Sequence, residues 1–446
     1  MLDGWGLRTA NAYIAVGLCV VGGVSCAGEA LTSNAQGGVD GRDSIGARPF
    51  AKPPQLRDSV EASGEPPSPA DRPERPRGQP PVRPQPTQEA RIQVRAVMAP
   101  FNLPAGDVSV GHFRIHLIDV GTGLSILVQG HDFNLLYDGG SNDDGGKISA
   151  RGNNNRLLSY LYGAIGPSGP KECQPDGDLW PQNTSNSRHA IDNVFLSHPH
   201  RDHASMLADV VHCYAVSQFW DAGVRYGTIA YNNLLSAIAV ALPTIEYRIA
   251  ASVYQSSSPP SGMRIPSAAQ TNAFFESKPM QLGKNASLVV LHADGTSHPS
   301  DANRNSTVVR LDLGSVRMLL VGDAEGGSRE NPSARANGTE RYLLDNHRDA
   351  LRADILQVGH HGSMTSSRLE FIQAVAPSYA LFGVGPRPYA GIVLPDQAVV
   401  DAISQLPSAP QIIRTDVHDR EGCPIADRFG VDNSSPAGCD NYLLTF

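Results

Sequence analysis

The chain has 446 residues and carries 36 Lys and Arg against 44 Asp and Glu, so its formal charge is −8, and 40% of its residues are hydrophobic. This composition excludes a fully disordered polyampholyte and a multi-span membrane protein. The acidic balance provides no broad cationic face for long nucleic acid or anionic lipid, so a polyanionic substrate would have to be held locally, for instance by metal.

The first 27 residues have the pattern of an export signal. An apolar run at 12–24 is followed by Ser25 and Ala27, the small residues that signal peptidase requires. The run is short for a membrane span, so we expect export to the periplasm or the cell exterior and no transmembrane segment beyond the signal. A lipid anchor at Cys26 and a buried N-terminal helix are the alternatives.

Residues 28–100 are predicted to be a linker. This segment is rich in proline, and Phe50 is its single aromatic residue. Such a sequence cannot bury enough apolar surface to offset the entropy of an ordered chain, and its prolines favour extended segments. We therefore expect a solvated spacer before a folded domain at 101–446. The arginines of the linker leave a contact with the cell envelope or with nucleic acid as the alternative.

Four of the six cysteines lie within the predicted domain: Cys173, Cys213, Cys423 and Cys439. An even number of cysteines in an exported chain favours two disulfides, and these spacings match no zinc-binding pattern. We expect Cys423 to pair with Cys439 across a polar loop and Cys173 to pair with Cys213. Buried free thiols are the alternative.

Apolar, β-branched segments alternate with segments of helical spacing throughout the domain. Strands are predicted at 113–120, 124–128, 134–138, 193–197, 287–291, 307–312, 316–321, 353–358, 379–383 and 411–415. Helices are predicted at 156–165, 204–212, 340–351, 369–376 and 396–406. The mixture of hairpins and strand–helix units indicates an α/β protein with two sheets packed between helices.

A cluster of possible metal ligands follows the strand predicted at 193–197. It consists of His198, His200, Asp202 and His203, which lie within six residues of one another. Imidazoles and carboxylates are the usual protein ligands of transition metals. On a tight turn, this spacing can direct His198 and His200 to one metal ion and Asp202 and His203 to a neighbouring ion.

Two later strand ends carry further candidate ligands. Asp323 follows an apolar strand and is placed to bridge two cations, and His360 and His361 follow another strand. Neighbouring side chains after a strand start on opposite sides of the backbone, so we expect one of the two histidines to bind metal. We predict His361 as the ligand, because Gly362 allows a sharp turn towards the metals. We predict that His360 contacts the substrate, where its imidazole can hydrogen-bond a phosphoryl oxygen or protonate the leaving group.

These motifs resemble the metallo-β-lactamase superfamily. HPHRDH, LLVGDAEG and HHGS, preceded by LIDVGTG and LLYDGG, are most similar to the metal-dependent hydrolase domain of ComEC/Rec2-type competence proteins and their stand-alone relatives, over about residues 111–420. The resemblance implies an αββα sandwich with a two-metal site, usually zinc and sometimes manganese. It also implies hydrolysis of a phosphodiester or of another ester or amide bond.

The sequence departs from these relatives at several motif positions. Leu124 stands where the early motif usually ends in an acidic residue, and Leu394-Pro395 stands where many relatives carry His-Pro. The third-motif histidine of classical lactamases has no clean counterpart, because Asn305 occupies the position that the relatives use. One metal ion is therefore expected to have fewer protein ligands than the other.

We expect two divalent cations to lower the pKa of a shared water, with Asp202 essential to the reaction as a ligand. Asp138 ends a strand beside a double glycine and is expected to orient a ligand histidine rather than bind metal. Asn305 and Ser363 are expected to support the ligands in the same way, and Glu325 is expected to be a supporting residue.

The leading function is therefore that of an exported metal-dependent hydrolase that acts on a phosphodiester, as a nuclease or phosphodiesterase. A hydrolase of the same fold that acts on a thioester, lactone or β-lactam would share every metal ligand, because a fold does not determine the substrate. A metal-binding envelope module without catalytic activity is the third possibility.

Overall fold

The computed structural model describes most of the chain after residue 90. The described residues are 91–97, 103–141, 156–167, 169, 173, 185–224, 226–241, 244–251, 270–271, 279–295, 301–385, 387–389, 391–417 and 440–446. All of them belong to one unit of the chain, Arg83–Phe446. The predicted signal at 1–27, the predicted linker up to residue 90 and the predicted Cys423–Cys439 disulfide lie outside the described residues.

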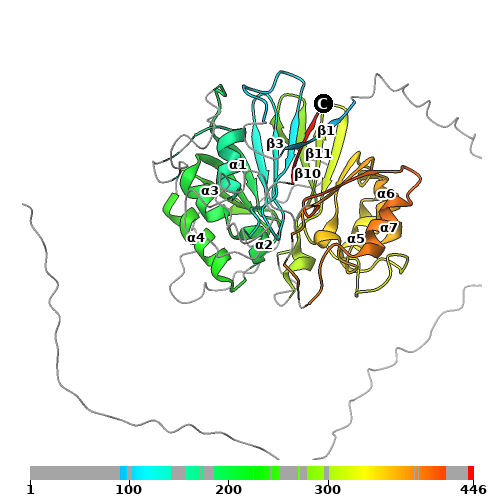
Figure 1. Cartoon of the computed structure of the whole chain (residues 1–446). Coiled ribbons are helices and arrows are strands. Elements are labelled where there is room, and N and C mark those ends of the chain that lie inside the picture. Colours follow the sequence, from blue (N-terminus) through cyan, green and yellow to red (C-terminus); the bar gives the residue numbers. More distant parts are fainter. Residues whose placement is uncertain are drawn as a thin grey trace, which may run out of the picture. The chain divides into compact units, whose positions relative to one another are not determined.

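Two mixed sheets lie between two layers of helices (Figure 1). The described strands of the first sheet follow the order β1 (Gln93–Val97), β16 (Asn441–Thr445), β2 (Arg114–Leu117), β3 (Ile126–Gln129), β4 (Asn134–Tyr137), β5 (Ile191–Phe195), β6 (Val216–Asp221), β7 (Glu246–Ile249) and β8 (Gln270–Thr271). Those of the second follow the order β15 (Gln411–Arg414), β14 (Tyr379–Phe382), β13 (Ile355–Gln357), β12 (Val316–Leu320), β11 (Val308–Leu313), β10 (Ala286–His292) and β9 (Met280–Gly283). Strands β4 to β8 are parallel, as are β12 to β15, and the other neighbours are antiparallel.

The helices cover the outer faces of the sheets (Figure 1). The described helices on the first sheet are α1 (Arg156–Ala164), α2 (Arg201–Ala204), α3 (Leu207–Cys213) and α4 (Ile229–Ala241). Those on the second are α5 (Gly338–Asn346), α6 (Leu369–Val375) and α7 (Gln397–Ser404), with the short turn η6 (Arg348–Ala350) after α5. One apolar core lies between the sheets, and each helix layer shares a further core with its own sheet. This architecture is the predicted αββα sandwich.

Strand β12 illustrates how the sequence produces these layers. Val316, Met318 and Leu320 belong to the core between the sheets, whereas Leu319 packs in the core beneath the helices. Successive side chains of a strand point to opposite faces, so a strand that is covered on both faces needs an almost continuous apolar run. The strand ends where the polar ligand motif begins, and the core therefore positions that motif at one edge of the sheet.

The strands and helices predicted from the sequence are present, with ends shifted by a few residues. The helix predicted at 204–212 corresponds to α3, with α2 as an additional short helix before it, and the helix predicted at 340–351 is α5 followed by η6. The structure adds β1, β6, α4, β7, β8, β9 and β16, which the sequence analysis did not predict.

The folded domain begins earlier than the predicted boundary at residue 101. Strand β1 lies within the segment that we predicted to be linker, and it pairs with β16 from Gln93↔Thr445 to Val97↔Asn441. The proline-rich composition upstream dominated the prediction, while the partner that stabilises β1 lies at the other end of the sequence. Strand β16 also pairs with β2, so β1 is a full member of the first sheet.

Cys173 and Cys213 form a disulfide, as predicted. The bond joins the end of α3 to the segment that follows α1. Among the described residues, no helix is both long and apolar enough to span a membrane.

Candidate metal centre

The histidine motif follows β5, a parallel strand between β4 and β6. The motif turns directly into α2, which begins at Arg201 and carries Asp202 and His203. Backbone contacts from two glycine motifs hold this turn: Leu124 N donates to the Asp202 carbonyl at 3.2 Å, and Gly139 N donates to the His203 carbonyl at 2.7 Å. The Asp202 carbonyl also packs against Gly123, whose φ is 138° and where a Cβ would clash with the carbonyl oxygen. The early GTG motif is thus explained by close backbone packing.

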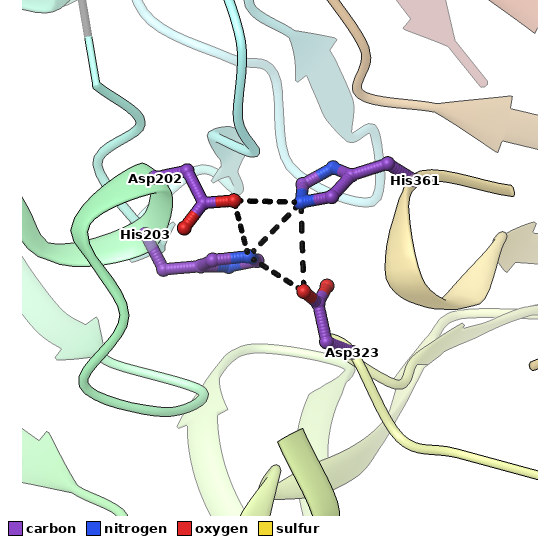
Figure 2. A group of neighbouring side chains, drawn as sticks. All are labelled: Asp202, His203, Asp323 and His361. Carbon is purple, nitrogen blue, oxygen red and sulfur yellow. Dashed lines mark hydrogen bonds and ion pairs between the residues drawn. The ribbon is translucent and has the colours of Figure 1, made fainter. Parts of the chain in front are cut away.

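Four side chains from three separate segments form the first donor group: Asp202, His203, Asp323 and His361 (Figure 2). One donor atom from each lies within 4.8 Å of the others. His203 Nε2 is 3.2 Å from Asp323 Oδ2, and His361 Nε2 is 3.2 Å from Asp202 Oδ2. We call these residues the four-donor group.

His198, His200 and Asp323 form a second group, which we call the three-donor group. His198 Nε2 lies 3.0 Å from His200 Nδ1 and 3.7 Å from Asp323 Oδ2. Asp323 follows β12, and its backbone N–H donates to Ser306 Oγ at 3.1 Å. Because Asp323 belongs to both groups, it lies between the two sets of histidines.

The described residues fit a pair of transition-metal ions. His203 Nδ1 faces Asp138 Oδ2 at 2.8 Å and His361 Nδ1 faces the Gly383 carbonyl at 2.6 Å, so each Nδ1 donates and Nε2 is the atom of each ring that faces the cluster and could bind a metal. Asp323 Oδ1 is buried and has no hydrogen-bond partner among the described residues. A cation would satisfy this oxygen, which otherwise carries a desolvation cost.

The two carboxylates of the four-donor group are held in their ionised form. Burial would raise the pKa of Asp323, but His203 and His361 outweigh burial and hold this pKa well below its usual value. Burial would also raise the pKa of Asp202, and the same two histidines lower it. The cluster therefore supplies two carboxylates that stay ionised, which is the form that binds a metal cation.

The imidazoles of the two groups differ in their protonation. Burial lowers the pKa of both His198 and His200. Burial would lower the pKa of His203 and His361 too, but Asp323 and the neighbouring carboxylates raise both. In the metal-free chain the four-donor group therefore retains protons that the three-donor group does not.

Asp138 lies behind the ligands. Its Oδ1 accepts from Ser197 N, and its Oδ2 accepts from Ser197 Oγ, both at 2.7 Å, in addition to the contact with His203. Asp138 is in neither donor group. This placement suits the orienting role that we expected from the sequence.

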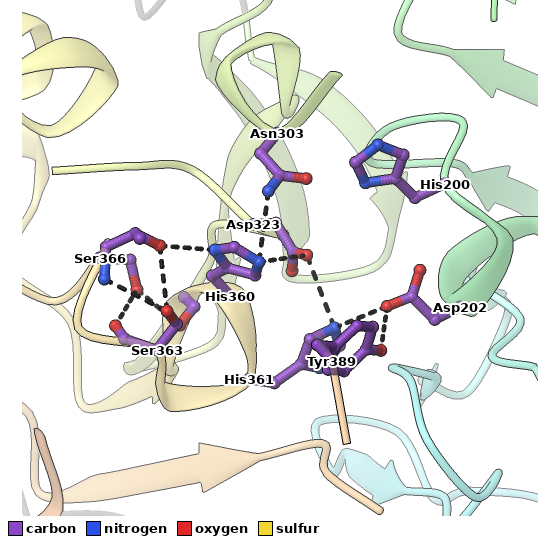
Figure 3. Close-up of polar contacts among 12 residues, drawn as sticks. His200, Asp202, Asn303, Asp323, His360, His361, Ser363, Ser366 and Tyr389 are labelled. Atoms are coloured by element: carbon purple, nitrogen blue, oxygen red, sulfur yellow. Dashed lines mark hydrogen bonds and ion pairs between the residues drawn. The ribbon is translucent and has the colours of Figure 1, made fainter. Parts of the chain in front are cut away.

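His360 and His361 lie in the turn η7 (Gly359–Gly362) and diverge from each other (Figure 3). His361 joins the four-donor group, whereas His360 Nε2 is 3.2 Å from Asn303 Nδ2 and 3.8 Å from Asp323 Oδ2. The physical reason differs from the strand alternation that we assumed, because both histidines have left-handed backbones with φ of 47° and 54°. Two successive left-handed residues turn the chain sharply and separate the rings.

The remaining predicted site residues lie further from the donor atoms. Asn305 is buried, its Nδ2 donates to the Asp294 carbonyl, and its Oδ1 has no partner among the described residues. Ser363 Oγ accepts from Thr365 N at 3.2 Å, and Thr365 Oγ1 in turn lies 2.7 Å from His360 Nδ1. Ser363 therefore supports His360 rather than a member of either donor group.

Several neighbours of the centre were missed by the sequence analysis. Tyr389 donates its hydroxyl to Asp202 Oδ2, and its ring stacks on His361 with centroids 6.0 Å apart and an interplanar angle of 9° (Figure 3). Asn303, on the turn η5 (Ala302–Asn305), contacts His360 and lies 3.5 Å from Glu325 Oε1. Tyr389 has no spacing that marks it in the sequence, whereas Asn303 lies on the same turn as Asn305 and could have been found from that motif.

No protein-family model matches the chain. ComE operon protein 3 of Bacillus subtilis is 33% identical over 88 residues, which are 20% of this chain and 10% of that protein. Recombination protein 2 of Haemophilus influenzae is 24% identical over 274 residues, which are 61% of this chain and 24% of that protein. The aligned part of the chain thus spans a quarter or less of the length of these curated relatives.

The metallo-β-lactamase fold protein YhfI from Bacillus subtilis aligns with 68% of this chain and 97% of its own, at 12% identity and a TM-score of 0.34. The layer order of this chain, two mixed sheets between helices with the histidine motif at the end of β5, is observed directly. The chain is thus distantly similar in sequence to ComE operon protein 3 and Recombination protein 2, and its layer order is that of the predicted αββα sandwich.

Proposed function

We propose that the protein is a metal-dependent hydrolase that holds two divalent cations, zinc or manganese, and cleaves a phosphodiester. The observation that carries the proposal is Asp323, whose Oδ2 serves both donor groups and whose Oδ1 is buried without a partner among the described residues. A carboxylate between two sets of ligands is the arrangement that a two-metal hydrolytic site requires.

In this proposal, each donor group would hold one cation, and Asp323 would serve both groups. The bound cations supply Lewis acidity towards the scissile group and a hydroxide nucleophile at neutral pH. The chain itself contributes orientation: Asp138 and the Gly383 carbonyl hold the rings of His203 and His361 by their Nδ1 atoms. This pre-organisation limits the rearrangement that ligand binding would otherwise require.

Two side chains at the rim of the centre are the proposed substrate contacts. The His360 side chain is 22% exposed and lies beside Asp323, and Tyr389 is 37% exposed and covers His361. Burial lowers the pKa of His360, so its ring meets a phosphoryl oxygen or the leaving group mainly in the neutral form, through one N–H. The Tyr389 hydroxyl, which donates its proton to Asp202 Oδ2, lies on the other side of the four-donor group (Figure 3).

The preference for a phosphodiester rests on the resemblance of the HHGS motif and of Asn305-Ser306 to the hydrolase domains of ComEC/Rec2-type proteins. An acidic chain repels a polyanion at long range, so an anionic substrate depends on bound cations for its affinity. A thioester, lactone or β-lactam substrate stays the competing proposal, because it would use the same ligands.

The decisive test compares substrates on one metal-loaded preparation. We expect hydrolysis of bis(p-nitrophenyl) phosphate or single-stranded DNA to exceed that of nitrocefin, and Asp202→Ala to abolish it. Asp401→Asn, an exposed carboxylate on α7, is the matched control and should keep the wild-type rate. Turnover of nitrocefin without phosphodiester turnover would reverse the order, and bound metal without turnover of any ester would favour the non-catalytic envelope module.

We propose further that the chain is exported and that its linker spaces the domain from the envelope. The Cys173–Cys213 disulfide supports this proposal, because such bonds persist in oxidising compartments. Thiol titration of the denatured, non-reduced mature protein should read near zero. A reading of four thiols would contradict both predicted disulfides and weaken the proposed export.

A further inference from the structure

Asn303 is a buried amide beside the three-donor group, and its two ends have different surroundings. The residue is 8% exposed and lies on the turn η5. Its Oδ1 is buried and has no hydrogen-bond partner among the described residues. Buried amide oxygens in folded proteins nearly always have a partner, so this oxygen needs a group that the described residues do not supply.

The backbone of η5 is tied to two residues of the three-donor group. Ser306, which follows η5, donates its backbone N–H to the Asn303 carbonyl at 3.0 Å. The Oγ of Ser306 accepts from Asp323 N at 3.1 Å and lies 3.4 Å from His198 Nδ1. The side chain of Asn303 therefore starts from a backbone that is held by the same contacts that position these two ligands.

The amide of Asn303 is oriented through its nitrogen. Its Nδ2 lies 3.2 Å from His360 Nε2 and 3.5 Å from Glu325 Oε1. A carboxylate oxygen accepts hydrogen bonds, and so does an imidazole nitrogen without a proton, so the NH₂ end of the amide belongs on this side. The oxygen then points the other way, and Figure 3 shows it on the side of His200. Asn303 thus directs its unpartnered oxygen towards a histidine of the three-donor group.

We propose that Asn303 Oδ1 is a fourth ligand of the cation held by the three-donor group. The inference rests on the two-cation site of the proposed function. Amide carbonyl oxygens bind divalent cations in protein sites, and a cation would satisfy the buried oxygen. The amide is neutral, so with this ligand the three-donor group still carries less negative charge than the four-donor group and binds its cation more weakly.

Asn305, on the same turn, is the competing ligand, because its Oδ1 also has no partner among the described residues. The Nδ2 of Asn305 donates to the Asp294 carbonyl, so this side chain is held by the segment that follows β10. Asn303 instead contacts His360, whose Nε2 is 3.8 Å from Asp323 Oδ2. The ligand is therefore assigned to Asn303.

The test measures zinc binding by the full chain, stripped of metal by dialysis and then titrated in competition with a chromogenic chelator. Asn303→Ala should weaken the second equivalent about tenfold or more and leave the first unchanged, because it removes a ligand of one group only. Asn303→Asp keeps an oxygen at this position and removes the NH₂ donor, so it should bind the second equivalent at least as tightly as the wild type. Asn346→Ala, an exposed asparagine at the end of α5, is the matched control.

A purely structural role for Asn303 predicts the opposite result for Asn303→Asp, because the new carboxylate would lose the contacts of Nδ2 and face Glu325 with a like charge. Loss of the second equivalent in both variants, unchanged affinity in Asn303→Ala, or loss in Asn305→Ala alone would overturn this ligand and leave the two-cation site in place. Wild-type protein that binds a single zinc ion would contradict the two-cation site and this ligand with it. Circular dichroism checks folding, and Asn303→Asp decides the outcome if Asn303→Ala does not fold.

Discussion

The two donor groups of the candidate metal centre share Asp323 but differ in how the chain supports them. In the four-donor group, a carboxylate holds His203 and a backbone carbonyl holds His361. In the three-donor group, hydroxyls stand behind His198, with Ser197 Oγ at 3.0 Å and Ser306 Oγ at 3.4 Å from its Nδ1. The second group also has one donor fewer.

The four-donor group therefore has both more donor atoms and more strongly held histidines than the three-donor group. An ionised partner raises the basicity of a ligand histidine more than a hydroxyl does, and a pre-oriented ligand loses less freedom when it binds. We therefore expect the two cations to bind unequally, with the four-donor group filled first. The following predictions test this inequality, in order of decreasing effect.

The largest effect is expected from Asp323→Asn, which removes the charge that both groups share. We expect both metal equivalents to be lost and hydrolysis to fall by at least about two orders of magnitude. Elemental analysis after zinc or manganese reconstitution measures the metal, with Asp401→Asn as the control. A variant that retains two equivalents would show that Asp323 does not join the groups.

The next prediction concerns one histidine of each donor group. His203→Ala should remove the tightly bound equivalent, whereas His198→Ala should remove the weaker equivalent and leave the tighter one in place, because each histidine serves one group. Competition with a chromogenic chelator measures both affinities, and we expect losses of about tenfold to a hundredfold at the affected group. Equal losses at both groups in either variant would contradict the division.

A smaller effect concerns pH. The raised pKa values of His203 and His361 mean that a cation must displace protons from the four-donor group, whereas His198 and His200, with lowered pKa values, are already neutral. The affinity of the four-donor group should therefore fall more steeply as the pH is lowered from neutral. Calorimetry in buffers of different ionisation enthalpy counts the released protons. Release of protons with the second equivalent rather than the first would reverse the assignment.

The smallest effect is expected from Tyr389→Phe, which keeps the ring on His361 and removes the hydroxyl that donates to Asp202. Loss of one hydrogen bond of about 1 kcal/mol should weaken the four-donor group by about fivefold and leave the three-donor group unchanged. Tyr342→Phe, an exposed tyrosine on α5, is the matched control. Equal weakening of both groups would assign Tyr389 a general structural role.

Much of the fold could be predicted because its elements are local patterns. The apolar runs that form β12 and β13 end directly at the ligand motifs, and both ends were visible in the sequence. Strand β1 could not be predicted in the same way, because Gln93–Val97 is stabilised by pairing with β16 at the far end of the chain. The same holds for Tyr389, which contacts the centre only through the arrangement of separate loops.

The sequence by itself determined which residues could bind metal. The spacing of His198, His200, Asp202 and His203 is local, and a strand followed by a tight turn suffices to expose them together. Only the tertiary structure decided how they are grouped. Asp323 and His361 come from a different sheet, and their distances to the first cluster depend on how the two sheets pack face to face. Packing between layers brings together segments that are distant in sequence, and a local sequence pattern does not predict which segments will meet.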